Sequence, residues 1–70
     1  MKPNTRIFHY TLLNFHDEVM ISKDFEYEQV ISAIARGGRL FWETESCARV
    51  LIATDDGFKA TIEWGLRDKY

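Results

Sequence analysis

Hydrophobic and polar residues alternate with two different periods along this chain, and the periods divide it into strands and one helix. Residues 6–13 (Arg-Ile-Phe-His-Tyr-Thr-Leu-Leu) are rich in β-branched and aromatic side chains, which favours a first strand. Apolar side chains stand at both parities of this segment, so we expect both of its faces to be covered, one of them by a partner or a second subunit. Residues 14–18 are predicted to form a turn, and residues 19–21 a short strand or an extended lead into the helix.

The helical period predicts one helix over residues 24–36. Ser22 or Asp24 can cap its start, because either side-chain oxygen can accept a hydrogen bond from an N–H of the first turn. Gly37-Gly38 is expected to end it, since glycine readily adopts the left-handed conformation that closes helices. The i, i+3, i+4, i+7 spacing gives one apolar stripe that should face the sheet, formed by Tyr27, Val30, Ile31 and Ile34.

Three more strands are predicted after the helix, over residues 39–43, 48–54 and 58–64. The last alternates cleanly, with Phe58, Ala60, Ile62 and Trp64 on its inner side. A three-residue loop, Asp55-Asp56-Gly57, would pair Thr54 with Phe58 and oppose Ile52 to Ala60. A two-residue loop would slip the register by one residue and mix the two faces. The fold predicted for residues 1–70 is a single α+β domain, with one α-helix packed on one face of a four- to five-stranded antiparallel sheet, in the order β(β)αβββ.

The same parity divides the predicted sheet into an inner and an outer face. Leu40 and Trp42 join the inner face, if residues 44–46 form a hairpin turn. On the outer face, Arg49 is expected between Phe41 and Glu63, in a stacked and charge-paired arrangement. The full outer set is Arg39, Phe41, Glu43, Arg49, Leu51, Lys59, Thr61 and Glu63.

Composition indicates a folded chain and excludes several classes of protein. Of its 70 residues, 46% are hydrophobic and 29% charged, which argues against disorder. Nine Lys and Arg against eleven Asp and Glu give a net charge of −2, whereas a general nucleic-acid binder normally carries a basic excess. Cys47 is the only cysteine, so no intramolecular disulfide can form. No signal peptide or membrane-spanning run is recognisable, and the expected compartment is the cytoplasm.

Chemistry-bearing motifs are sparse. No His-x-x-x-His or Cys-x-x-Cys spacing points to a metal, and the Gly37-Gly38 pair follows the expected helix rather than preceding one, so no phosphate loop is predicted. We therefore expect no metal and no cofactor. Cys47 with His9 or His16 could pair a nucleophile with a base, but nothing in the sequence places them within reach. A small enzyme using Cys47 or His9 is the third of three hypotheses.

The leading hypothesis is a non-enzymatic protein-binding module that acts through the outer sheet face, with a homodimer as one form of partner. Phe41 and Leu51 would anchor the partner, and Arg39 and Arg49 would orient it. Such a chain would be a small regulator, inhibitor or accessory subunit, a kind of protein common in phages and mobile elements. The alternative is a nucleic-acid-binding domain in which Arg39, Arg49 and Lys59 contact phosphates and Phe41 stacks on a base. No motif identifies a family.

Overall fold

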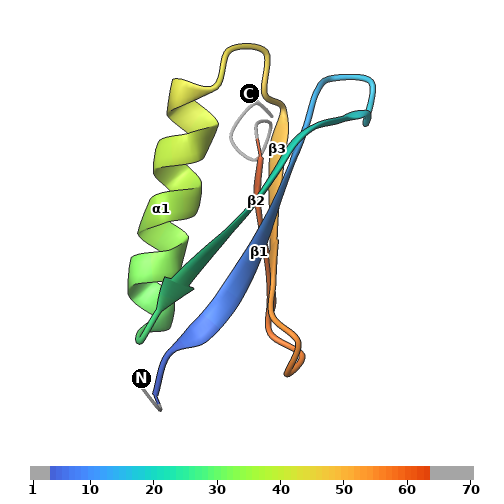
Figure 1. Cartoon of the computed structure of the whole chain (residues 1–70). Helices are drawn as coiled ribbons and strands as arrows, with labels where there is room; N and C mark the ends of the chain where they lie inside the picture. The colour runs from blue at the N-terminus through green and yellow to red at the C-terminus, as the bar shows by residue number, and fades with distance from the viewer. Residues whose placement is uncertain (1–3, 64–70) are drawn as a thin grey trace, which may run out of the picture.

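Four antiparallel strands form one sheet, and one helix packs against one of its faces (Figure 1). The computed structural model describes residues 4–63. Its elements are β1 (Arg6–Leu13), β2 (Val19–Tyr27), α1 (Val30–Glu43), β3 (Arg49–Ala53) and β4 (Lys59–Glu63). The strand order is β2-β1-β3-β4, so β2 and β3 run in the same direction on either side of β1 and are connected through α1. The predicted α+β class, with one helix on an antiparallel sheet, is confirmed.

The β3–β4 hairpin has the predicted loop and register. Gly57 has a φ of 105°, and the backbone N–H of Thr54 donates to the Phe58 carbonyl oxygen over 3.0 Å. Ile52 lies opposite Ala60, so the apolar residues of both strands share one face. A glycine suits this loop because positive φ carries no Cβ penalty there. Trp64, the last inward residue of the predicted strand, lies outside the described residues.

The predicted helix over residues 24–36 is wrong at both ends. Residues 24–27 belong to β2, where Phe25 and Tyr27 pack against the core while Asp24 and Glu26 are exposed. Pairing with β1 provides hydrogen-bond partners for the backbone of this segment. Its apolar and polar residues therefore alternate with the period of two of a strand, rather than with the helical period. Helix α1 therefore begins at Val30, and its N-cap residue, Gln29, makes no side-chain capping hydrogen bond.

The predicted glycine stop lies inside α1. Gly37 is buried, and a Cβ there would lie 2.6 Å from Cδ1 of Ile52 and 3.0 Å from Cδ1 of Ile62. The helix approaches the sheet so closely at this point that a side chain would collide with it. Close packing can offset the roughly 1 kcal/mol that a glycine costs in a helix. The predicted strand over residues 39–43 is thus wrong as well, because those residues form the last turns of α1.

The core fills the single layer between α1 and the sheet. The Tyr10 hydroxyl donates to the Ala33 carbonyl oxygen over 2.7 Å, and burial raises the pKa of this phenol to about 12. Arg36 lies over the Phe25 ring, 4.6 Å from its centroid, and donates to the Tyr27 hydroxyl over 2.8 Å. The buried cluster comprises Phe8, Tyr10, Leu12, Ala33, Leu40, Phe41, Cys47, Val50 and Ile52.

Three apolar residues of α1 point away from this core, contrary to prediction. Ile31 and Ile34, expected to face the sheet, are 73% and 38% exposed, and Trp42, expected on the inner sheet face, is 71% exposed. The helix face that packs on the sheet instead contains Gly37 together with residues three or four positions away along the helix. Its buried residues are Ala33, Gly37, Leu40 and Phe41. In the part of the chain that the structure describes, no helix is both long and apolar enough to cross a membrane.

Candidate functional site

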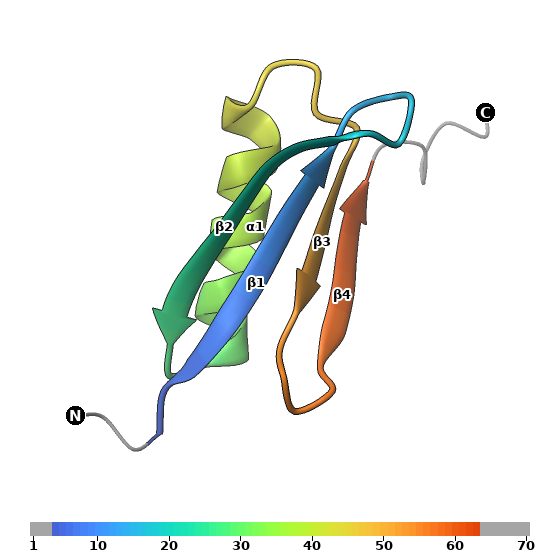
Figure 2. The same cartoon turned by 45° about the vertical axis from the view of Figure 1, so that its right-hand side comes forward.

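The face of the sheet opposite α1 has no cover among residues 4–63, and we call it the open face. Figure 2 views the sheet from this side, with α1 behind it. Antiparallel neighbours that lie directly opposite each other share a face, so the register gives its members. One row across the sheet is Asp24, His9, Ala53 and Lys59, and the next is Ser22, Thr11, Leu51 and Thr61. The remaining members of the open face are Ile7, Leu13, Val19, Glu26, Arg49 and Glu63.

Leu51 is the apolar residue in the middle of the open face, and Ile7 and Val19 lie toward its ends. The Leu51 side chain is 36% exposed, between Thr11 on β1 and Thr61 on β4. Ile7, near the start of β1, is 49% exposed. Leu13, the other apolar residue that the sequence places on this side of the first strand, is buried. The first strand is therefore only partly covered on its second face.

Arg49 is held in place by two carboxylates at one end of the open face. Its Nε donates to Oε1 of Glu63 over 2.8 Å, and one terminal nitrogen donates to Oδ1 of Asp17 over 3.2 Å. Asp17 belongs to the β1–β2 turn and has a φ of 62°, a conformation that aspartate tolerates better than most residues. The predicted pair of Arg49 with Glu63 is confirmed, and the predicted stacking of Arg49 on Phe41 is wrong because Phe41 belongs to α1.

His9 is placed between two carboxylates at the other end of the open face. Its Nδ1 lies 3.0 Å from Oδ1 of Asp24, and its Nε2 lies 3.2 Å from Oδ1 of Asp55. Only the imidazolium form can donate from both nitrogens at once. The hydrogen bond to Asp24, followed by the charges of both carboxylates, raises the pKa of His9 above 6.5 although partial desolvation opposes the change. The charges at both ends of the face are thus positioned before any partner arrives.

The pKa of His9 gives a first testable prediction. In an NMR titration, the His9 ring should have its midpoint above 6.5, and Asp24→Asn should lower that midpoint more than Asp55→Asn does. Because folding raises the pKa, the stability that His9 contributes is fully present below pH 6.5 and is lost as the pH rises through the folded-state value. His9→Asn should remove this part of the pH dependence. An unshifted midpoint in the wild type would show that the two contacts do not form in solution.

The structure separates the four predicted partner-binding residues. Arg49 and Leu51 lie on the open face, but Arg39 and Phe41 lie on α1, in the other layer. Phe41 is 6% exposed and packs in the core, which corrects its predicted position on the sheet surface. Arg39 is exposed and pairs with Glu43 on the next turn, with 3.4 Å between the charged atoms. A role in partner binding stays a prediction, and Arg49 and Leu51 are the two of the four residues that share the open face.

The geometry does not assemble the nucleic-acid site of the alternative hypothesis. Phe41 is buried and cannot stack on a base, and Arg39 lies in a different layer from Arg49 and Lys59. The open face also carries carboxylates from β2 and β4, which would repel a phosphate backbone.

The nucleophile of the enzyme hypothesis, Cys47, is buried. Its thiol donates to the Arg49 carbonyl oxygen over 3.5 Å, and desolvation raises its pKa, which disfavours the reactive thiolate. Cys47 precedes the start of β3, whereas His9 lies opposite Ala53 at the other end of that strand. Residues 4–63 contain no group of three or more His, Cys, Asp or Glu that could hold a metal ion.

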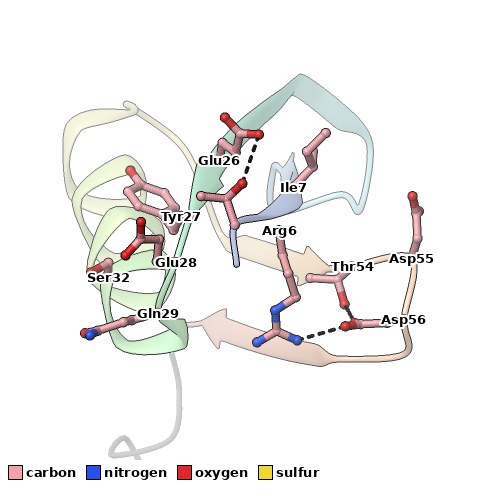
Figure 3. A pocket seen from close by; sticks show the side chains of 11 residues that line it. Arg6, Ile7, Glu26, Tyr27, Glu28, Gln29, Ser32, Thr54, Asp55 and Asp56 are labelled. Carbon is pink, nitrogen blue, oxygen red and sulfur yellow. Dashed lines mark hydrogen bonds and ion pairs between the residues drawn. The ribbon is translucent and has the colours of Figure 1, made fainter. Parts of the chain in front are cut away.

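A groove of about 1030 Å³ opens at the end of the domain where α1 begins (Figure 3). Arg6, the only Lys or Arg among its lining residues, pairs with Asp56 over 3.0 Å and so ties the β3–β4 loop to β1. Hydrogen bonds from Thr54 and Arg6 lower the pKa of Asp56. The other charged lining residues, Glu26, Glu28 and Asp55, are carboxylates, so the groove is unsuited to an anionic ligand.

Comparisons with known proteins give no guide to this site. No protein-family model, no curated protein and no solved structure matches the chain. We therefore infer function from the geometry and chemistry of the open face.

Proposed function

We propose that this chain is a small non-enzymatic protein-binding module, a regulator, inhibitor or accessory subunit, that holds a protein partner on the open face. The observation that supports this proposal is the uncovered sheet surface with Leu51 at its centre. A central apolar residue surrounded by polar and charged groups is the usual composition of a protein interface. The ion pairs of Arg49 and His9 hold long side chains in place, which reduces the entropy lost on binding.

The charges of the open face suggest the chemistry of the partner. Arg49, Lys59 and the protonated form of His9 supply positive charge. The carboxylates from β2, β4 and the two turns still outnumber them: Asp17, Asp24, Glu26, Asp55 and Glu63. A complementary partner would present a basic surface with an apolar contact for Leu51. Complementary charge of this kind speeds association and excludes acidic partners.

Leu51→Arg tests the proposal. An arginine at this half-exposed position should fit the strand, yet it removes the apolar centre and adds positive charge that faces a basic partner. We expect at least about tenfold weaker retention of specific partners by the tagged protein in lysates of its native host, as centrally placed anchors typically give. Ser32→Arg, an exposed substitution on α1, is the matched control and should retain them. Equal recovery with both variants, each shown to be folded by circular dichroism, would refute the assignment of the open face.

A further inference from the structure

One edge of the sheet carries backbone groups in a pattern that suits a second strand. Among the described residues β4 pairs only with β3, and it lies at the end of the strand order. The hydrogen bond from the Thr54 N–H to the Phe58 carbonyl oxygen identifies Thr54 and Phe58 as a hydrogen-bonded pair of this ladder. In an antiparallel ladder hydrogen-bonded and non-hydrogen-bonded pairs alternate, so residues 58, 60 and 62 direct their N–H and C=O groups toward β3. Lys59, Thr61 and Glu63 direct theirs to the outer edge.

We propose that this edge binds a second copy of the chain, β4 against β4, about a two-fold axis that passes between Thr61 and Thr61 of the partner subunit. In this register Lys59 lies opposite Glu63 of the partner subunit, and the pair occurs twice by symmetry. The outward-directed backbone groups then meet their counterparts in about six hydrogen bonds. A shift by two residues in either direction would lose both ion pairs. The two sheets would join into one continuous sheet, and Ala60 and Ile62 would extend its core face.

The flank of α1 on the β4 side is apolar and exposed. Arg36 and its contacts with Phe25 and Tyr27 mark the opposite flank, which lies over β2. The helical period places Ile31, Ile34 and Trp42 away from Arg36, on the side of the β4 edge. Ile31 and Trp42 are each more than 70% exposed. This flank therefore carries large apolar surface on the same side as the β4 edge, which is unpaired among residues 4–63.

The position of α1 over the sheet brings two such flanks together in the proposed dimer. Gly37 packs on Ile52 of β3 and Ile62 of β4, so the middle of α1 contacts this side of the sheet at the level of Thr61. Because the two-fold axis is normal to the joined sheet, the two helices would cover the same face of it, with their β4-side flanks turned toward each other.

The two helices would be antiparallel, because the axis is normal to the sheet. Ile31 and Trp42 stand on either side of the helix middle, so Ile31 would contact Trp42 of the partner subunit. The interface thus combines edge pairing with burial of apolar helix surface. It runs along the β4 edge of the open face, at Lys59, Thr61 and Glu63, and leaves Leu51 uncovered. The proposed dimer holds whether or not the proposed function is correct.

Molar mass and amide exchange test the dimer together. Light scattering after size exclusion should give a mass rising with concentration toward twice the 8.2 kDa of one chain. Hydrogen exchange of the Lys59, Thr61 and Glu63 amides should slow over the same concentration range. A mass that stays at 8.2 kDa at the highest concentration would overturn the proposal.

Two variants distinguish this interface from any other. Thr61→Pro removes an N–H that β3 does not use, so the monomer should fold, while the edge can no longer pair. Ile31→Glu places a charge on the apolar flank, and Ser32→Glu on the opposite flank is its control. Thr61→Pro and Ile31→Glu should each raise the dissociation constant of the dimer at least about tenfold, and Ser32→Glu should not. A dimer unchanged by both would lie on another surface, and Ile31→Glu decides the question even if Thr61→Pro fails to fold.

Discussion

Phe41→Asp is expected to leave the chain unfolded at room temperature. Phe41 is 6% exposed and packs among the residues of the core on the sheet side of α1. Truncating a buried aromatic side chain typically costs about 3–5 kcal/mol, and an unpaired buried carboxylate adds several more. Since small domains are stable by only about 5–15 kcal/mol, little stability would be left. Far-UV circular dichroism and urea titration measure the loss.

Two substitutions serve as controls for this result. Phe41→Leu keeps an apolar side chain, so it should lower the free energy of unfolding far less than Phe41→Asp does. The expected loss is about 1.5 kcal/mol, in addition to the cost of the smaller side-chain volume. Arg39→Asp, two residues earlier on the exposed side of α1, should leave the chain folded, because it affects only a surface ion pair. A cooperatively folded Phe41→Asp variant with a wild-type midpoint would place Phe41 on the surface, where the sequence pattern puts it.

Gly37→Leu is expected to lower the free energy of unfolding by about 2 kcal/mol, the net of overpacking against a gain in helix propensity. The reason is the position of the missing Cβ, 2.6 Å from Cδ1 of Ile52. Gly38→Ala is the matched control: no atom lies within 4 Å of its Cβ position, so this substitution should stabilise the chain by up to about 1 kcal/mol.

A double-mutant cycle identifies the contact responsible. Ile52→Val removes Cδ1, so the combination of Gly37→Ala with Ile52→Val should be more stable than the sum of the single changes predicts. Additive effects in urea titrations would show that the helix does not approach the sheet at this point.

The parts of the fold that local chemistry specifies could be predicted from the sequence. The β3–β4 hairpin follows from clean alternation and from one glycine at a positive φ. The predicted helix is misplaced because two local sequence patterns fit a helix terminus as well as another structure. Asp24 and Glu26 resemble a helix start, yet they belong to the exposed side of a strand. Gly37 resembles a helix end, yet it provides space for Ile52. In both cases the local sequence fits two structures, and packing against residues distant in the sequence determines which of them forms.

The candidate site likewise contains residues whose positions follow from local sequence and residues whose positions depend on long-range packing. Arg49 and Leu51 were correctly placed on the outer sheet face, because their parity follows from the hairpin. Phe41 was misplaced because its parity depended on a strand that is a helix. The contacts of His9 depend on pairing between β1 and β2 and on the distant β3–β4 loop. With Asp24 assigned to a helix, no sequence signal could have brought these groups together.

Since α1 covers only one side of the sheet, a two-fold axis normal to that sheet would turn both open faces in the same direction. A dimer joined at β4 would then present two copies of the open face side by side, at a fixed distance from each other. A partner with two matching sites, such as another symmetric dimer or a repetitive assembly, would gain avidity, because its second contact becomes intramolecular. A partner with a single site would gain nothing. In such a dimer the one-sided helix would favour targets that are themselves multivalent.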